Sequence, residues 1–245
     1  MPINKKRQDK IAHLEFEGGN KQIVFLHGWG TNSRSFLPLI PYLYNKYKVH
    51  LIDLPGFGKS QFNSKLKSSF DYAEEIIKWI KSKKIKNIYL TGHSFGGKIA
   101  AIIARKEPQL VKKLILIAPS GIKDRKLSVL YKIKEIIPQR IISAISPFAK
   151  RHLASRDYKE AGKLLPLFKN IVKENLEEVF REIKVPTLII WGKDDRELNQ
   201  KYGKKINSLV KNSKLKIVEG DHFPFLENPK KIAKLIENFI ENGKD

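Results

Sequence analysis

A serine between two glycines is the pattern in this chain with the clearest chemical meaning. The segment Gly92-x-Ser94-x-Gly96 follows an apolar run at 88–90 and precedes apolar residues with helical spacing at 99–104. This order predicts a strand, a tight turn and a helix, with the Ser94 hydroxyl projecting above the end of a sheet. Side chains at positions 92 and 96 would crowd the strand and the helix, so glycine is required there. The chemistry indicated is nucleophilic attack by serine; the alternative is an ordinary serine N-cap.

A serine nucleophile needs a histidine that accepts its proton and an acid that orients the histidine. In open parallel sheets flanked by helices, catalytic side chains lie at the carboxyl ends of the strands. An expected strand at 185–191 is followed by Asp194 and Asp195, and one at 215–218 by Asp221 and His222. Only one of the adjacent aspartates can point at His222. The sequence therefore predicts a serine, an aspartate and a histidine, in that chain order.

The remaining histidines have weaker claims to chemistry. His27 is interpreted as structural, and His93 as a packing and hydrogen-bonding residue beside the nucleophile. His13, His50 and His152 belong to no motif. There is no cysteine and no H-E-x-x-H pattern, so we expect neither a metal nor a cofactor.

A phosphate-binding loop is also not expected. Gly58-Lys-Ser60 resembles the end of such a loop, but the glycine that the motif needs five positions earlier is Asp53, whose charge would repel phosphate.

Strands and helices must alternate to position these residues. Period-two alternation at 13–17, ending in two glycines, predicts an edge hairpin. One helix is expected to bury Phe70, Ala73, Ile76, Ile77 and Ile80 on a single face. Further buried strands are expected at 22–27, 47–53, 87–91, 111–118, 185–191 and 215–218, and further helices at 200–209 and 229–240. The fold class is α/β, a mostly parallel sheet with helices on both faces.

The alternation stops between Pro119 and Ile183, where short amphipathic segments are interrupted by prolines. We interpret this stretch as an inserted helical cap at 119–183, on a core made of 1–118 and 184–245. Apolar cap residues are expected to line an acyl pocket. The residues expected to contact substrate are Trp29, Phe95, Leu130, Phe148 and Phe223.

Five ordered motifs together resemble the α/β-hydrolase superfamily. They are His27-Gly-Trp-Gly30, Asp53-Leu-Pro-Gly-Phe-Gly-Lys-Ser60, Gly92-His-Ser-Phe-Gly-Gly97, Trp191-Gly-x-x-Asp195 and His222-Phe-Pro-Phe-Leu-Glu-Asn-Pro229. The resemblance implies a triad of Ser94, Asp195 and His222, because its Trp-Gly-x-x-Asp spacing selects Asp195 over Asp194. It also implies an oxyanion hole made by the backbone N–H groups of Trp29 and Phe95, and a turn at Asp53.

The resemblance implies a cofactor-free serine esterase that cleaves carboxylic esters. One alternative is a C–C bond hydrolase of the meta-cleavage type, whose elbow is similar. Another is an esterase for acyl chains on an acyl carrier protein, similar to the pimeloyl-acyl-carrier-protein methyl ester esterases. Those usually carry Trp and Leu where this chain has His93 and Phe95. A non-catalytic binding protein on a hydrolase scaffold is the alternative outside enzymes.

The chain of 245 residues carries a net charge of +23. Lysines outnumber arginines by 39 to 9, whereas nucleic-acid readout favours arginine, so no nucleic-acid partner is expected. Nine of these basic residues fall between 121 and 156, against two acids, which suggests docking of an acidic acyl carrier protein or only a compositional bias. With no signal peptide and no membrane span expected, we predict a cytoplasmic protein.

Overall fold

The computed structural model describes residues 10–123 and 164–242. Its centre is a seven-stranded sheet in the order β1-β3-β2-β4-β5-β6-β7, in which only β1 runs antiparallel to its neighbour. The strands are β1 (His13–Phe16), β2 (Lys21–Leu26), β3 (Tyr47–Ile52), β4 (Ile88–His93), β5 (Val111–Ile117), β6 (Thr187–Gly192) and β7 (Ser213–Val218). The expected mostly parallel sheet is confirmed.

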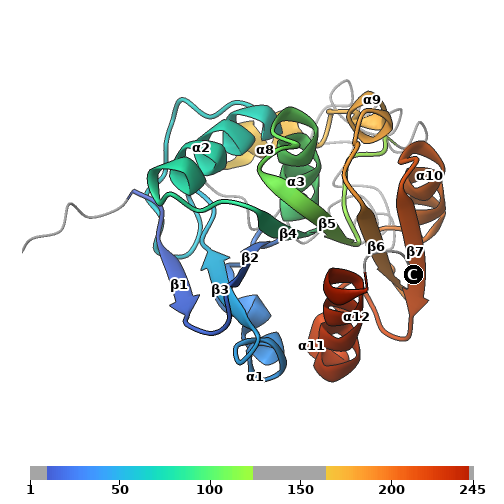
Figure 1. Ribbon diagram of the computed structural model, residues 1–245. Coiled ribbons are helices and arrows are strands. Elements are labelled where there is room, and N and C mark those ends of the chain that lie inside the picture. The colour runs from blue at the N-terminus through green and yellow to red at the C-terminus, as the bar shows by residue number, and fades with distance from the viewer. Residues whose placement is uncertain (1–9, 124–163, 243–245) are drawn as a thin grey trace, which may run out of the picture.

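Helices cover both faces of this sheet, as Figure 1 shows. The described helices are η1 (Ser33–Leu39), α1 (Ile40–Leu43), α2 (Ser69–Ser82), α3 (Phe95–Lys106), α8 (Leu165–Ile171), α9 (Glu177–Arg181), α10 (Lys201–Leu209), α11 (Pro224–Glu227) and α12 (Pro229–Glu241). Helices α2, α3 and α10 lie on one face, and α1 and α12 lie on the other. Because both faces are covered, β4 and β6 are buried along their whole length and β2 over its last four residues, which explains their apolar runs.

Helix α2 begins at a capping box, in which the Ser68 hydroxyl accepts from the Asp71 N–H and the Asp71 carboxylate accepts from the Ser68 N–H. Its buried face includes Ala73, Ile76 and Ile80, as expected. The expectation for Phe70 is wrong, because this side chain is 42% exposed. At 100° per residue, Phe70 lies about a quarter turn away from the centre of the buried face, which Ser69, Ala73, Ile76 and Ile80 mark.

The expected hairpin at the N-terminus is also wrong. Strand β1 pairs with β3, with Glu15 opposite His50, and not with β2. Both edges of β2 are occupied, by β3 on one side and β4 on the other, so β1 cannot pair with β2 and instead pairs with the outer edge of β3.

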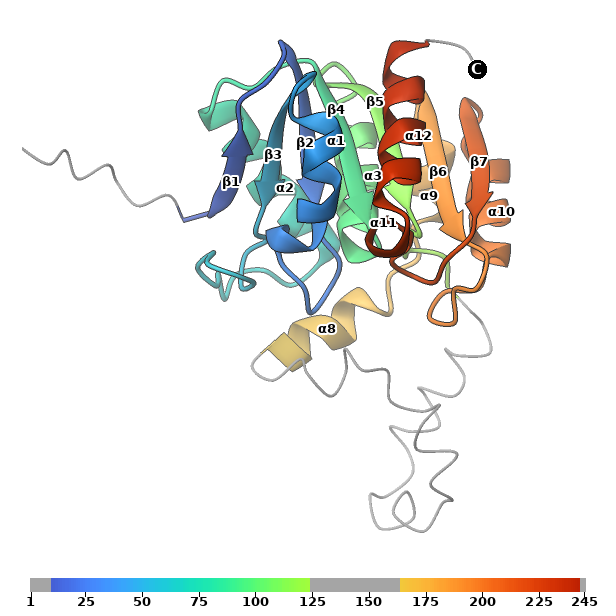
Figure 2. The same ribbon diagram turned by 90° about the horizontal axis from the view of Figure 1, so that it is seen from below.

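The segment interpreted as a cap contains α8 and α9 among its described residues. Helix α8 lies beyond the end of the sheet, as Figure 2 shows. It buries Leu167, Phe168 and Ile171. Two residues expected in the acyl pocket, Leu130 and Phe148, lie outside the described residues. Across 10–123 and 164–242, no helix is both long and apolar enough to cross a membrane.

Candidate active site

Ser94 occupies a sharp turn between β4 and α3. Its φ of 49° and ψ of −111° lie in a region that non-glycine residues rarely adopt, and its side chain makes no capping hydrogen bond to the helix. The turn is held by the Ser94 N–H, which donates to the Ile117 oxygen at 3.0 Å. A Cβ at Gly96 would lie 2.1 Å from the Leu26 oxygen, so only glycine allows the helix to approach β2 this closely. The geometry is that of a serine presented by a strained turn and does not match an N-cap.

Asp195 and His222 form a buried pair at the ends of β6 and β7. The His222 Nδ1 lies 2.8 Å from the Asp195 Oδ2, and the two side chains are 4% and 0% exposed. The other carboxylate oxygen, Oδ1, accepts the N–H groups of Glu197 and Leu198 at 2.9 and 2.8 Å. With both oxygens occupied, the carboxylate is fixed against the imidazole. Asp194 is exposed and makes no such contact in the described structure.

His93 links the serine turn to the histidine loop. Its Nε2 lies 2.9 Å from the His222 carbonyl oxygen, so Nε2 carries the proton and donates. Its ring packs against those of His222, Phe223 and Phe225 at 4.7, 4.7 and 5.1 Å between centroids. Burial lowers the pKa of His93 well below its ordinary value. The interpretation of His93 as a packing and hydrogen-bonding residue is confirmed, and Phe223 lies beside both histidines.

His27 is a neutral structural residue. Its Nε2 accepts the Leu54 N–H at 3.0 Å, so Nδ1 carries the proton and donates to the Gly28 oxygen at 2.7 Å. Burial lowers the pKa of His27 to about 4, although the Gly28 oxygen and Asp53 favour its protonation. These bonds join the end of β2 to the chain beyond β3, which fixes the turn that carries Trp29.

Asp53 organises the neighbouring turn. It accepts the N–H groups of Ser33 and Lys59, both at 2.8 Å. Burial alone would raise the pKa of Asp53, but these hydrogen bonds outweigh it and the pKa is lowered. Asp221 is exposed, and its Oδ1 accepts the N–H of Phe223. Of the described acids, Asp195 is the one whose carboxylate meets the His222 Nδ1.

Trp29 and Phe95 lie at two adjacent chain turns. Phe95 is the first residue of α3, so its N–H has no helical carbonyl to bind and is free for another acceptor. The Trp29 ring packs against Phe57, Phe95 and Phe168 at 5.0, 5.3 and 4.9 Å between centroids. An apolar wall therefore adjoins the serine turn, and the part of it made by Phe168 comes from α8.

A family model described as the alpha/beta hydrolase fold matches residues 21–136. The pimeloyl-[acyl-carrier protein] methyl ester esterase of Wigglesworthia glossinidia brevipalpis is 30% identical over 253 residues, which cover 91% of this chain and 95% of that protein. The chain belongs to the α/β-hydrolase family. The described strand order and the serine turn agree with this membership.

Solved structures of other α/β-hydrolases share the fold. An esterase from Exiguobacterium antarcticum superposes with a TM-score of 0.74 at 21% identity, covering 94% of this chain and 95% of the esterase. The meta-cleavage product hydrolase from Pseudomonas fluorescens IP01 superposes with a TM-score of 0.74 at 16% identity, covering 96% and 95%. At these identities the likeness concerns the fold.

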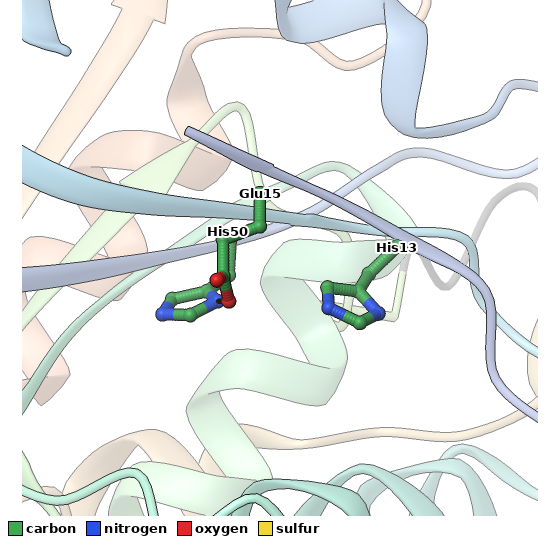
Figure 3. A group of neighbouring side chains, drawn as sticks. All are labelled: His13, Glu15 and His50. Carbon is green, nitrogen blue, oxygen red and sulfur yellow. Dashed lines mark ion pairs between the residues drawn. The ribbon is translucent and has the colours of Figure 1, made fainter. Parts of the chain in front are cut away.

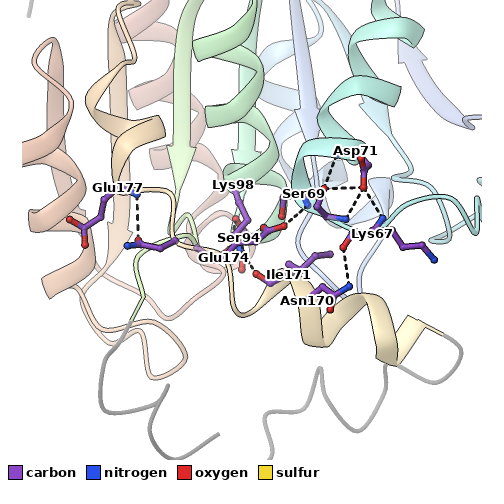
Figure 4. A network of polar contacts seen from close by, with 12 residues as sticks. Lys67, Ser69, Asp71, Ser94, Lys98, Asn170, Ile171, Glu174 and Glu177 are labelled. Atoms are coloured by element: carbon purple, nitrogen blue, oxygen red, sulfur yellow. Dashed lines mark hydrogen bonds and ion pairs between the residues drawn. The ribbon is translucent and has the colours of Figure 1, made fainter. Parts of the chain in front are cut away.

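This hydrolase has a buried lysine one turn after its serine. Lys98 Nζ donates to the Ile171 oxygen at 2.7 Å and lies 3.3 Å from the Glu174 Oε2. The second Glu174 oxygen accepts the Ser69 N–H at 2.8 Å, as Figure 4 shows. Burial lowers the pKa of Lys98, and Glu174 opposes this effect. The network ties α3 to the end of α8 and the start of α2, so it holds the described end of the expected cap on the core of the hydrolase.

Sequence reasoning missed several residues around the hydrolase site. Phe168 lies on the apolar face of α8, a face that the spacing of Leu167, Phe168 and Ile171 could have indicated. Lys98 gave no signal, because a lysine is ordinarily exposed. Glu197 Oε2 lies 3.7 Å from the His222 Nε2, and only the fold of the loop after β6 brings it there.

Proposed function

We propose that this chain hydrolyses carboxylic esters through an acyl-enzyme, with Ser94 as nucleophile, His222 as general base and Asp195 as the acid that orients it. The observation that carries the proposal is the buried 2.8 Å contact between His222 Nδ1 and Asp195 Oδ2, on a fold that presents Ser94 from a strained turn. A buried carboxylate beside one imidazole nitrogen holds the proton there and leaves Nε2 as the base.

In the first step, the Ser94 Oγ attacks the ester carbonyl carbon while His222 Nε2 takes the hydroxyl proton. The tetrahedral oxyanion is stabilised by the N–H groups of Trp29 and Phe95, each worth about 3 kcal/mol of barrier in such sites. The imidazolium then gives its proton to the departing alcohol as the C–O bond breaks. Water, deprotonated by the same nitrogen, attacks the acyl-serine and releases the acid.

The fixed carboxylate supports this mechanism in a second way. Because both Asp195 oxygens are occupied, the imidazole is held in one orientation. Proton transfer then requires little reorganisation free energy. The apolar wall of Trp29, Phe95 and Phe168 suits the acyl part of a substrate, and Phe223 borders the histidine side. Leu130 and Phe148 remain predicted pocket residues.

The test is covalent labelling of the nucleophile. A fluorophosphonate probe should modify the wild type at Ser94, and Ser94→Ala should be unlabelled and lose about 10³-fold or more of its turnover of p-nitrophenyl butyrate. Ser120→Ala is the matched control, because Ser120 also contacts the serine turn, through its N–H to the Ser94 oxygen. Labelling of Ser94→Ala at the wild-type rate would refute the proposal, and absence of turnover in the wild type would favour a binding protein.

A second candidate substrate is an ester on an acyl carrier protein. The relative named a pimeloyl-[acyl-carrier protein] methyl ester esterase aligns with 91% of this chain, and the net charge of +23 suits an acidic partner. The meta-cleavage reaction has support from fold alone. A cytoplasmic location, the absence of a nucleic-acid partner and the division into a core (1–118 and 184–245) and a cap (119–183) stay predictions.

A further inference from the structure

Two histidines and a glutamate meet at the edge of the sheet, away from Ser94. His13 and Glu15 are two residues apart and therefore point to the same face of β1. His50 lies opposite Glu15 on β3. One ligand atom from each of the three residues lies within 4.8 Å of the others. Figure 3 shows both imidazole rings and the carboxylate on the same side of the two strands. Two imidazoles and a carboxylate are a donor set suited to Zn²⁺ and related divalent transition metals.

The hydrogen bonds around His50 leave its Nδ1 beside a carboxylate oxygen, with no donor between the two atoms. Its Nε2 lies 3.1 Å from the Gln22 Oε1, an acceptor, so the ring proton belongs on Nε2. Nδ1 then presents a lone pair, and it faces the Glu15 Oε2 at 3.0 Å. The His50 side chain is 2% exposed, and Nδ1 is buried without a hydrogen-bond donor. Two acceptors in contact repel each other unless a positive ion lies between them.

The Glu15 carboxylate can supply one oxygen to such an ion. The other glutamate oxygen, Oε1, is already paired with the Lys48 Nζ at 3.0 Å. Oε2 therefore remains available to a second cation, and its neighbour is the buried Nδ1.

We infer that His13, Glu15 and His50 form a Zn²⁺ site that clamps the edge strand β1 onto β3. Zinc ligands at about 2.0–2.2 Å from the ion lie roughly 3.4 Å from one another in a tetrahedral site. The His50 Nδ1 and Glu15 Oε2 atoms, at 3.0 Å, must therefore move apart by about 0.4 Å, and a pair at up to 4.8 Å must close by up to about 1.4 Å. Side-chain rotation of the partly exposed His13 and Glu15 allows both movements while His50 stays fixed. Water would complete the four-coordinate shell. The site is separate from the proposed ester hydrolysis, because its residues lie on the edge strands β1 and β3, whereas the proposed triad follows β4, β6 and β7.

The test is Zn²⁺ titration of untagged, chelator-treated protein by isothermal calorimetry. The wild type should bind one equivalent. His13→Gln and Glu15→Gln should each weaken binding at least about tenfold, since each removes one of three ligands. Glu75→Gln is the matched control, because Glu75 is a glutamate on α2 paired only with Lys78 among described residues. Lys48→Gln should tighten binding, because it removes a positive charge beside Glu15, and a merely disruptive change would not do this.

Location is read from Trp79, whose ring lies 4.9 Å from that of His13 and 6.4 Å from that of His50. Stoichiometric Ni²⁺ should quench tryptophan fluorescence in the wild type, and should quench it much less in Trp79→Phe and in His13→Gln. Zn²⁺ should also raise the melting temperature of the wild type but not that of His13→Gln. If His13→Gln and Glu15→Gln bind Zn²⁺ as the wild type does, the inference is wrong. If the wild type binds none, the Gln22 amide is reversed and His50 Nδ1–H simply donates to Glu15, which also overturns it.

Discussion

The His93 Nε2 donates to the carbonyl oxygen of His222 at 2.9 Å, so the residue before the serine holds the backbone of the paired histidine. The serine turn and the histidine loop come from strands far apart in the chain, and this bond fixes their separation. A chain with another side chain at position 93 would have to make this connection differently.

We expect His93→Phe to lower kcat for a short p-nitrophenyl ester by about tenfold and to leave KM nearly unchanged. The phenyl ring keeps the contacts with Phe223 and Phe225 but leaves the His222 oxygen without its donor, so the imidazole loses its fixed position. His93→Gln should retain more activity, because its amide NH₂ can donate to the same oxygen. A higher kcat for His93→Phe than for His93→Gln would show that the ring and not the hydrogen bond matters.

Asp195→Asn should reduce kcat by about 10³–10⁴-fold, because an amide cannot hold the Nδ1 proton of His222 and stabilise the imidazolium. Asp194→Asn is the natural control, since Asp194 is adjacent, has the same chemistry and is exposed. It should keep activity within about twofold, with steady-state kinetics on both variants as the measurement. A severe loss in the Asp194 variant together with a mild one in the Asp195 variant would refute the assignment.

The choice between these aspartates illustrates what the sequence could and could not predict. Asp194 and Asp195 carry the same side chain and differ only in where that side chain points. The spacing of the family motif, and not a physical argument, selected Asp195. Strand positions were predictable because buried parallel strands are continuous apolar runs, as 22–27 and 185–191 are.

Long-range pairing was not predictable from local pattern. The partner of β1 depends on which strand edge is free. Phe70 was expected inside from its spacing although it lies at the border of the buried face of α2. The contacts of Lys98 with Glu174, and of Trp29 with Phe168, join residues more than 70 positions apart. The local sequence at each of these positions contains no information about its partner.

The buried pair of Lys98 and Glu174 should contribute to stability as a unit. Lys98→Met is expected to lower the free energy of unfolding by about 2–4 kcal/mol, because it leaves Glu174 charged and partly buried. In the double variant with Glu174→Gln, the loss should be smaller than the sum of the single losses. Lys106→Met is the control on the same helix; its ion pair with Glu74 is exposed, so it should cost less than about 1 kcal/mol. Urea denaturation of the two single variants, the double variant and Lys106→Met measures these free energies of unfolding. Strictly additive losses in the double variant would contradict coupling between Lys98 and Glu174.

Stability should fall in mild acid because His27 and His93 are buried in neutral form. Burial lowers the pKa of His27 to about 4 and that of His93 well below 6.5, whereas both have ordinary values in the unfolded chain. Between about pH 6.5 and 4 the unfolded chain therefore binds protons that the folded chain does not, and the free energy of unfolding decreases as pH falls. Each histidine contributes up to about 1.4 kcal/mol per pH unit in that window, and nothing above it.

Urea denaturation at several pH values measures that slope. His27→Gln, whose amide oxygen can still accept the Leu54 N–H, should reduce the slope by about one proton while lowering stability at pH 7.5 only modestly. Asp53 also affects stability in acid, but in a different pH range. Its pKa is lowered from an already low ordinary value, so its contribution to the free energy of unfolding is lost only below about pH 4. A wild-type slope of zero between pH 5 and 6.5 would contradict the neutral burial of both rings.

The excess of positive charge leads to the last prediction, which concerns the carrier-bound substrate. If an acidic carrier protein docks on the basic stretch at 121–156, charge attraction should act on the association rate, which dominates kcat/KM, and salt should weaken it. The triple variant Lys132→Glu, Lys134→Glu, Arg140→Glu should then lose about tenfold or more of kcat/KM on a carrier-bound methyl ester at low salt. Its rate on neutral p-nitrophenyl butyrate should stay near that of the wild type, because that ester needs no docking.

The matched control reverses Lys230, Lys231 and Lys234, three exposed lysines on or beside the outer face of α12, and changes net charge by the same amount. If both triple variants lose the same activity, only net charge matters; if neither loses any, the lysines reflect compositional bias and the carrier ester is not a substrate recognised through charge.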